Sequence, residues 1–356
     1  MSEPKRKSNA GKRVKYTIFA IIVAALAIFG TLYFITHANP DKGSKANSRT
    51  TVFRDAKELS AYWLYQGGVS GATKCWNAFC GEEMDTTNID DYERIRLLSI
   101  VNGEIRYDSL NSYAINSGCK TIIDIDTGFT PRAAVIGRSG VQYIGLGERN
   151  VIEKLNIAYE NLVSEKTMDH IEFYVASGTS STSMEDISKQ FDGEVCIIAK
   201  GVFSQLDEEG QIQMFENCKL LLEAHGGCIV TSDYVAADIL GSVAGALYGA
   251  SDGAIVCSKT KSLYTEAIGA NMRNPFELND KSRRLIESLG LQIEVVQLYQ
   301  DLPDLKCFEL LTEDQIAALR EAVPGNEFWV ITLAPSEPEP AAEEAPAEDA
   351  PAEESN

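Results

Sequence analysis

Two carboxylates and a glycine gather at the end of an apolar run in the first half of the chain. The run Thr121–Ile125 includes Asp124 and is followed directly by Asp126, Thr127 and Gly128. If the run is a strand of a parallel sheet, the turn after it lies at the edge where such sheets bind ligands. We therefore predict a ligand site at this turn. The alternative is that the two carboxylates only end a strand at a solvated edge and that Gly128 only makes the turn.

A second cluster, Gly145, Gly147 and Glu148, lies at the end of the next apolar run. The two glycines resemble a Gly-x-Gly phosphate loop, but no third glycine stands in the register that a dinucleotide-binding fingerprint requires. Dinucleotide binding is therefore not predicted. A metal site is not predicted either, because the three histidines of the chain are too few and too scattered to form one.

Apolar runs and helical patterns alternate along the chain, and the elements they predict must position both clusters. The predicted strands are 121–125, 141–146, 170–176, 194–199, 227–231, 291–298 and 327–333. The predicted helices are 104–117, a short one after the first turn, 150–163, 184–191, 208–225, 279–289 and 313–322. Nearly unbroken apolar strands that alternate with helices indicate a parallel sheet covered on both faces. The fold class is therefore α/β: a Rossmann-like, doubly wound, mostly parallel seven-stranded sheet with an antiparallel C-terminal strand.

The segments on either side of this region differ from it in composition. The uncharged apolar segment 16–36 is long enough to cross a bilayer as one helix. It is longer than the apolar core of a cleaved signal peptide, so a signal anchor is the favoured interpretation. The predicted domains are a basic N-terminus (1–15), a transmembrane helix (16–36), a linker (37–50), a helical and aromatic cap (51–95), the α/β domain (96–334) and a disordered acidic tail of Pro, Ala and Glu (335–356).

Charge sets the expected orientation and partners. Basic residues are more numerous before the apolar segment than after it, so the positive-inside rule places the N-terminus in the cytoplasm and the main domain outside it. Both flanks are basic, however, and the opposite orientation stays open. The net charge of −20 argues against nucleic acid as a partner, because the phosphates would be repelled.

The eight cysteines form no CxxC pair. Cys119, Cys196 and Cys228 stand in or beside apolar runs and are predicted to be buried thiols. Cys75 and Cys80 could form a disulfide if the domain faces an oxidising space.

Several motifs, taken in order, resemble those of a known family. The run 122–132 looks like the cofactor-binding motif of class I S-adenosylmethionine (SAM)-dependent methyltransferases, and is most similar to that of the leucine carboxyl methyltransferase family. Arg106 and Asp108 correspond to the Arg-x-x-x-Asp region of that family. The segment 200–209 resembles its Glu-Gly-x-x-x-Tyr-Leu motif, and Phe328-Trp329 its final strand. The resemblance covers about 95–335 and implies SAM as the cofactor.

Four positions depart from the pattern of the family. Asp126 replaces the first glycine of the turn, and Lys200 replaces a Glu. Ser177 replaces an Asp near the adenine. Where the family has its ribose-binding acid at the end of the second strand, this chain has Gly145 and Gly147 first and Glu148 after them. A carboxylate at position 126 adds bulk beside the methionine end and would repel the carboxylate of the cofactor. Lys200 could instead pair with a neighbouring acid.

The resemblance implies in-line attack of an acceptor on the sulfonium methyl group. In it, Arg106 would hold the carboxylate of the cofactor, and Asp124 its amino group or a bound water. The catalytic residues stay unassigned, because the sequence offers no strong base candidate; a carboxylate acceptor would need none. Two functions are therefore carried forward: a membrane-anchored methyltransferase acting on a small-molecule or protein carboxylate or another small acceptor, or a degenerate fold that acts as an extracytoplasmic binding or scaffolding domain. A different ligand in the same crevice, such as another nucleoside, is a third possibility.

Overall fold

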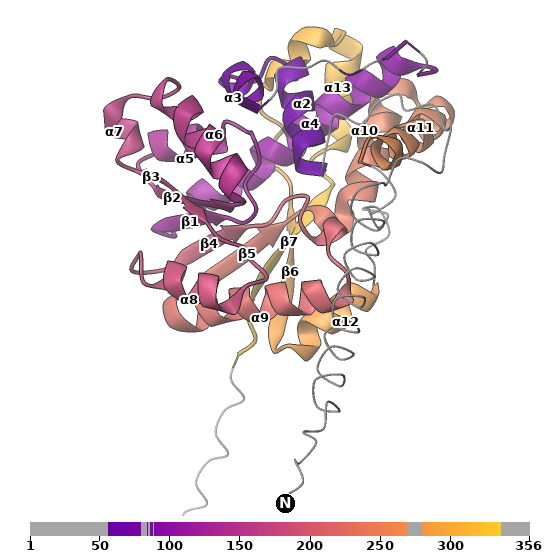
Figure 1. Ribbon diagram of the computed structural model, residues 1–356. Helices are drawn as coiled ribbons and strands as arrows, with labels where there is room; N and C mark the ends of the chain where they lie inside the picture. Colours follow the sequence, from indigo (N-terminus) through magenta and orange to yellow (C-terminus); the bar gives the residue numbers. More distant parts are fainter. Residues whose placement is uncertain (1–55, 80–83, 85, 88, 269–279, 336–356) are drawn as a thin grey trace, which may run out of the picture. The chain divides into compact units, whose positions relative to one another are not determined.

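The computed structural model describes residues 56–79, 84, 86–87, 89–268 and 280–335 (Figure 1). Its centre is one sheet of seven strands in the order β3-β2-β1-β4-β5-β7-β6. The strands are β1 Thr121–Asp124, β2 Gln142–Gly147, β3 Ile171–Val175, β4 Val195–Ile198, β5 Gly227–Thr231, β6 Leu291–Gln297 and β7 Glu327–Leu333. The first five are parallel, whereas β7 runs antiparallel between β5 and β6. The predicted fold class is confirmed for the sheet.

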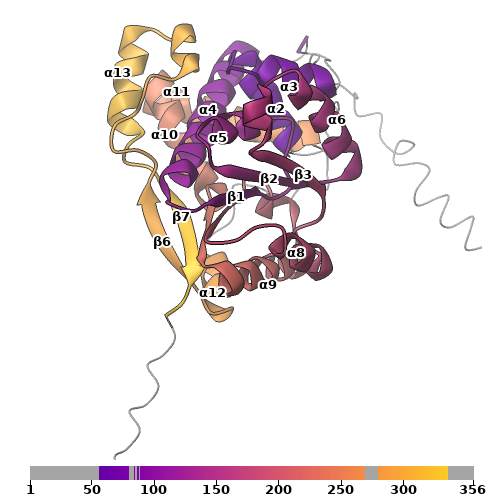
Figure 2. The same cartoon turned by 90° about the vertical axis from the view of Figure 1, so that its left-hand side faces the viewer.

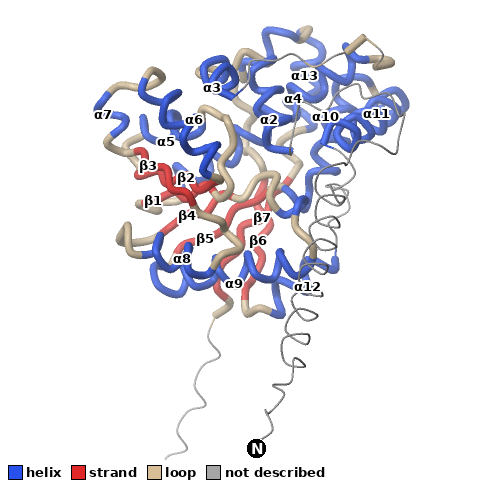
Figure 3. Tube along the Cα trace, viewed as in Figure 1, coloured by secondary structure: helices blue, strands red, loops and turns tan. Residues whose placement is uncertain are grey.

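Helices cover both faces of the sheet (Figures 1 and 3). The helices are α2 Ala56–Gln66, α3 Ala72–Phe79, α4 Tyr92–Asn116, α5 Arg132–Arg138, α6 Arg149–Glu160, α7 Glu165–Met168, α8 Ser181–Ser188, α9 Glu208–His225, α10 Ala236–Tyr248, α11 Ala250–Ile268, α12 Asp280–Ser288 and α13 Glu313–Ala322. Helices α4, α5 and α6 lie on one side of the strands, and helices α8, α9 and α12 lie on the other side (Figure 2).

Alternate residues of each strand feed two separate cores. Ile122 and Ile198 pack in the core on the α4 side, whereas Ile123 and Ile197 pack in the core on the α9 side. All four side chains are almost fully buried. Because successive strand side chains point to opposite faces, a continuous apolar run is what a strand buried on both faces requires. This requirement is the physical reason why the strands can be recognised in the sequence.

Local signals fix the helix ends that the sequence predicts. The Asp207 side chain accepts a hydrogen bond from the Gly210 amide and starts α9, and Thr312 and Gln315 form a capping box at the start of α13. At the other end of α9, Gly227 adopts a φ of 101°, and a Cβ there would lie 1.9 Å from the Val195 carbonyl oxygen. Glycine is therefore required where this helix turns into β5.

Other parts of the chain differ from the sequence prediction. The pair α10–α11 was not predicted, and α4 is longer than the predicted helix 104–117, so the proposed boundary at 95/96 falls inside it. The predicted cap contributes α2 and α3, whose aromatic rings cluster, with Trp76 stacked on Tyr65. No helix within the described residues is both long and apolar enough to cross a membrane. The predicted transmembrane helix, linker and acidic tail lie outside the described residues.

The cysteine predictions have separate outcomes. Cys119, Cys196 and Cys228 are buried, as expected. Cys75 is a buried free thiol whose pKa burial raises to about 12, and Cys80 lies outside the described residues. The possible disulfide between them therefore stays a prediction.

Candidate functional site

The chain reverses its direction of travel across the sheet at β1, which is where open α/β sheets bind ligands. From β1 the chain moves outward to β2 and β3, then returns to place β4 on the other side of β1. A cleft of about 390 Å³, the main cleft, opens at the carboxyl ends of these strands. It is lined by Asp126, Gly147, Glu148, Val175, Ala176, Ser177, Gly178, Thr179, Ser183, Val202, Gln205, Leu206 and Met214. A volume of this size falls in the range of small-molecule sites.

A second, smaller depression of about 100 Å³, the small hollow, adjoins the main cleft. Asp126, Glu148 and Gln205 line both, so the two spaces are neighbours. The remaining lining residues of the small hollow are Lys57, Glu58, Thr127, Gly128, Phe129 and Val151. Together the two spaces form a two-part site in which a large compartment meets a small, strongly charged one.

Asp126 stands at the junction of the two compartments. Its φ of 56° is left-handed, a conformation that aspartate tolerates better than most side chains. The backbone thus follows the path that a glycine would allow, with a carboxylate added. This carboxylate is 40% exposed and forms an ion pair with Lys57 at the start of α2. Next to it, Gly128 lets α2 approach, since a Cβ at that position would lie 3.2 Å from the Lys57 Cβ.

Glu148 follows β2 directly and is exposed at the rim of both compartments. Strand β2 extends through Gly147, one residue beyond its predicted end, and this extension brings Glu148 to the strand terminus. The two glycines of this strand have different roles. A Cβ on Gly145 would lie 2.7 Å from the Phe173 ring, so Gly145 is a packing residue inside the sheet rather than a residue of the cleft.

Ser177 lies two residues beyond β3 and lines the main cleft. Its hydroxyl is 2.9 Å from the Thr179 hydroxyl, and one of the two donates to the other. Val175, at the end of the same strand, is 49% exposed and lines the same cleft. The β3 end therefore offers both hydroxyl and apolar contacts to a ligand.

Asp124 faces away from both compartments. Its carboxylate accepts hydrogen bonds from Arg132 Nη1 at 2.5 Å and from the Tyr143 hydroxyl at 2.8 Å, and the side chain is buried. The Tyr143 hydroxyl is also 3.0 Å from the Thr127 hydroxyl. Burial, and then Asp124, raise the pKa of Tyr143 well above its usual value, so its proton stays in place. Asp124 was expected either to contact the cofactor or to end a strand at a solvated edge. In the structure its carboxylate instead belongs to a buried hydrogen-bond network with Arg132 and Tyr143.

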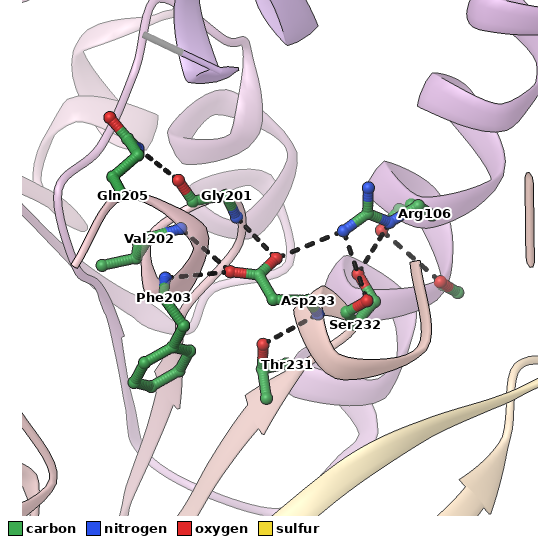
Figure 4. Close-up of polar contacts among 9 residues, drawn as sticks. Arg106, Gly201, Val202, Phe203, Gln205, Thr231, Ser232 and Asp233 are labelled. Atoms are coloured by element: carbon green, nitrogen blue, oxygen red, sulfur yellow. Dashed lines mark hydrogen bonds and ion pairs between the residues drawn. The ribbon is translucent and has the colours of Figure 1, made fainter. Parts of the chain in front are cut away.

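Arg106 is likewise engaged inside the protein (Figure 4). It donates from Nε to the Ser232 hydroxyl at 3.0 Å and from Nη2 to Asp233 Oδ1 at 3.2 Å. Asp233 also accepts the backbone amides of Gly201, Val202 and Phe203 at 2.7, 2.9 and 3.1 Å. The carboxylate of Asp233 thus pins the loop after β4 to the end of β5. Arg106 lines neither compartment. The predicted contact of Arg106 with the carboxylate of the cofactor stays a prediction.

Asp233 was not predicted from the sequence, although a signal was present. Asp233 follows the apolar strand β5 in the same way that Asp126 follows β1. Because parallel strands end at one edge, the same reasoning would have nominated it.

Lys200 lies two residues beyond β4 and is partly buried. Burial, followed by the positive charges of Arg106 and Arg132, lowers the pKa of Lys200 to about 7. The negative charges of Asp233 and Asp124 act in the opposite direction but do not compensate. Lys200 makes no hydrogen bond or ion pair with any residue in the described part of the chain, so the predicted pairing with a neighbouring acid is not present there.

Comparison with known proteins gives only distant structural likenesses. No protein-family model and no curated protein matches the sequence. Among solved structures, the methyltransferase domain of a bacterial Hen1 protein is 14% identical and has a TM-score of 0.40, covering 66% of this chain and 100% of that one. An O-methyltransferase family protein from Burkholderia thailandensis is 12% identical with a TM-score of 0.39, covering 89% of this chain and 83% of that one.

Human N-acetylserotonin methyltransferase, solved in complex with SAM, is 10% identical with a TM-score of 0.37, covering 82% of this chain and 75% of that one. Likenesses at this level leave the function to be argued from the residues of the chain itself. The fold and the site define an α/β protein with a Rossmann-like sheet and a two-part ligand site at its switch point.

Proposed function

We propose that the chain is a SAM-dependent methyltransferase whose cofactor lies across the two compartments. The observation that carries this proposal is Glu148, an exposed carboxylate at the terminus of β2 on the rim of the main cleft. At the end of the second strand of such a sheet, an acidic residue receives the two ribose hydroxyls of a nucleoside. The strand order and the resemblance of the segments 126–128 and 200–209 to the family motifs support the same function.

The lining of the main cleft fits a nucleoside. Apolar side chains from three elements, Val175, Val202 and Met214, supply surfaces against which a base can pack. Ser177 supplies a hydroxyl for the polar edge of the base, in place of the aspartate that the resemblance implies. The cleft is thus apolar where a base would lie and polar at its rim.

When bound, SAM supplies an electrophilic methyl group on a sulfonium centre. The residues of the chain would bind and orient it and exclude water, which is the main contribution that an in-line transfer needs. Glu58, Asp126 and Glu148 line the small hollow, so the junction of the compartments carries a negative potential that attracts a cationic sulfonium. This attraction falls once the methyl group has left and the sulfur is neutral.

The acceptor in this proposal is a carboxylate or another small acceptor, as in the leucine carboxyl methyltransferase family. Lys200 lies beyond β4, and its ammonium form would attract an anionic acceptor. A carboxylate needs no general base, whereas a hydroxyl does. Lys200 is the candidate base in that case, because its pKa of about 7 lies near the working pH. In the same proposal, segment 16–36 anchors the protein to a membrane with the main domain on the extracytoplasmic side.

One observation favours a second function, a degenerate fold that binds or scaffolds a partner without catalysis. Arg106 and Asp124, the two residues expected to hold the amino-acid end of SAM, are both committed to internal partners. In this alternative, the Lys57–Asp126 ion pair closes the small hollow instead of serving a ligand.

Calorimetric titration of the full-length protein with SAM and with its demethylated product, S-adenosylhomocysteine, separates the two functions. The methyltransferase proposal predicts micromolar binding of both compounds. Absence of binding at millimolar ligand, from protein shown to be folded by circular dichroism, would favour the degenerate fold.

A further inference from the structure

We infer that Lys57 and Asp126 together bind the amino-acid end of the cofactor, with its ammonium beside Asp126 and its carboxylate beside Lys57. The inference rests on the proposed function and deepens it. It transfers the role expected of Arg106 in α4 to Lys57, which lies in α2, outside the span of the resemblance.

The position of the ion pair supports this assignment. Lys57 and Asp126 both line the small hollow, which adjoins the main cleft through Asp126, Glu148 and Gln205. A ligand with its nucleoside in the main cleft therefore extends toward this pair. The hollow, at about 100 Å³, is smaller than the main cleft of about 390 Å³, so the smaller, amino-acid end of the ligand is assigned to it.

The charges of the hollow leave one place for a carboxylate. Among the nine described residues that line it, Lys57 is the one cation, and Glu58, Asp126 and Glu148 are acids. A ligand carboxylate beside any of the acids would be repelled. The ammonium and the sulfonium of the ligand, in contrast, are attracted by all three. The lining therefore orients a zwitterion in one direction.

The ion pair opens to a ligand on its Asp126 side. The Asp126 side chain is 40% exposed, whereas that of Lys57 is 10% exposed, so a ligand reaches the pair from the Asp126 carboxylate. A zwitterion inserted between the two side chains replaces one attraction with two, each to an opposite charge. The same insertion removes the difficulty that Asp126 would otherwise create, because the ligand carboxylate then faces Lys57 and the ligand ammonium faces Asp126.

The test compares two ligands that share the nucleoside and differ in the amino-acid end. S-adenosylhomocysteine carries the zwitterion, whereas 5′-methylthioadenosine ends in a methyl group. The full-length protein and its Lys57→Gln and Asp126→Asn variants are titrated with both by calorimetry. Asparagine tolerates the left-handed backbone as aspartate does, so the second variant removes charge without straining the turn. Lys281→Gln, which breaks the exposed ion pair with Glu208, is the matched control.

We expect Lys57→Gln and Asp126→Asn each to weaken binding of S-adenosylhomocysteine about 10-fold or more, the effect of losing one charge-assisted hydrogen bond. Binding of 5′-methylthioadenosine should change less than about 2-fold, and the control should change neither affinity. Equal effects of Lys57→Gln on the two ligands, no effect, or tighter binding of S-adenosylhomocysteine would overturn the inference while leaving the proposed function standing. If the wild-type protein binds neither ligand, the proposed function fails and the inference fails with it.

Discussion

The two halves of the crevice above the sheet use charged residues in opposite ways. In the open half, Asp126, which follows β1, and Glu148, which follows β2, line the two compartments. In the closed half, Asp124, at the end of β1, and Asp233, which follows β5, are buried, and their oxygens are occupied by arginines, a tyrosine and backbone amides. A carboxylate at the end of a strand therefore indicates the ligand edge of the sheet but does not by itself indicate contact with the ligand. Burial separates the two roles, because Asp126 stays partly exposed although Lys57 pairs with it, whereas Asp124 and Asp233 are buried against their partners.

The largest effect is expected from breaking the closed half at Asp233. Asp233→Ala leaves three amides without an acceptor and Arg106 without its charged partner, so the free energy of unfolding should fall by about 3–5 kcal/mol. Urea denaturation of the full chain measures this change. Asp238→Ala, at an exposed position in α10, is the matched control and should stay within about 0.5 kcal/mol of wild type. A loss below about 1 kcal/mol for Asp233→Ala would show that the pinned loop is not a structural unit.

Replacing Lys200 should change the free energy of unfolding in a pH-dependent way, by slightly less than the Asp233 substitution does. The pKa of Lys200 is about 7 in the folded protein and 10.5 in the unfolded chain. Below pH 7 the amine is therefore charged in both states, and burial of this charge destabilises the folded state. Between pH 7 and 10.5 the unfolded state binds more protons, and stability rises with pH through this group. Lys200→Met should therefore stabilise the protein by about 2–4 kcal/mol at pH 6, and the gain should vanish toward pH 10.5.

Denaturant unfolding of both proteins at pH 6, 8 and 10 tests this expectation, since other titrating groups cancel in the difference. A constant difference across this range would contradict the lowered pKa of Lys200.

A substitution in the open half should have the opposite effect: the affinity for the ligand should change, and the free energy of unfolding should not. Glu148 is exposed, so Glu148→Gln should alter the free energy of unfolding by less than about 0.5 kcal/mol. Loss of a charge-assisted contact to the ribose should weaken binding of S-adenosylhomocysteine about 10-fold. Glu153→Gln, one turn further along α6 and outside the cleft, is the matched control for calorimetry. Equal affinities of the two variants would remove Glu148 from the site.

The sequence predicts the sheet well because burial on both faces leaves a local record, a nearly continuous apolar run, at the central strands β1, β4 and β5. The pair α10–α11 leaves no such record. Gly241, Gly245, Gly249 and Gly253 recur at every fourth position, and glycine disfavours an isolated helix by about 1 kcal/mol per residue. A Cβ on Gly253 would lie 2.6 Å from the Ala244 carbonyl oxygen, so at that position the close approach of the two helices requires glycine. Tertiary packing thus overrides local propensity in this pair.

The candidate site was predictable to a smaller extent. Asp126, Gly128, Glu148 and Ser177 lie where strand ends place them, and they line the compartments. The contribution of Lys57 depends on a helix far upstream folding back over the β1 turn, a contact for which the sequence has no local signal. The internal roles of Arg106 and Asp124 also depend on partners that only the folded chain brings together.

The most direct test of the two-half description is a crystal structure of the protein with S-adenosylhomocysteine. The description predicts the nucleoside in the main cleft with its ribose hydroxyls on Glu148, the ligand carboxylate on Lys57, and Arg106 still bound to Asp233. A ligand carboxylate held by Arg106, with the Arg106–Asp233 ion pair broken, would contradict it.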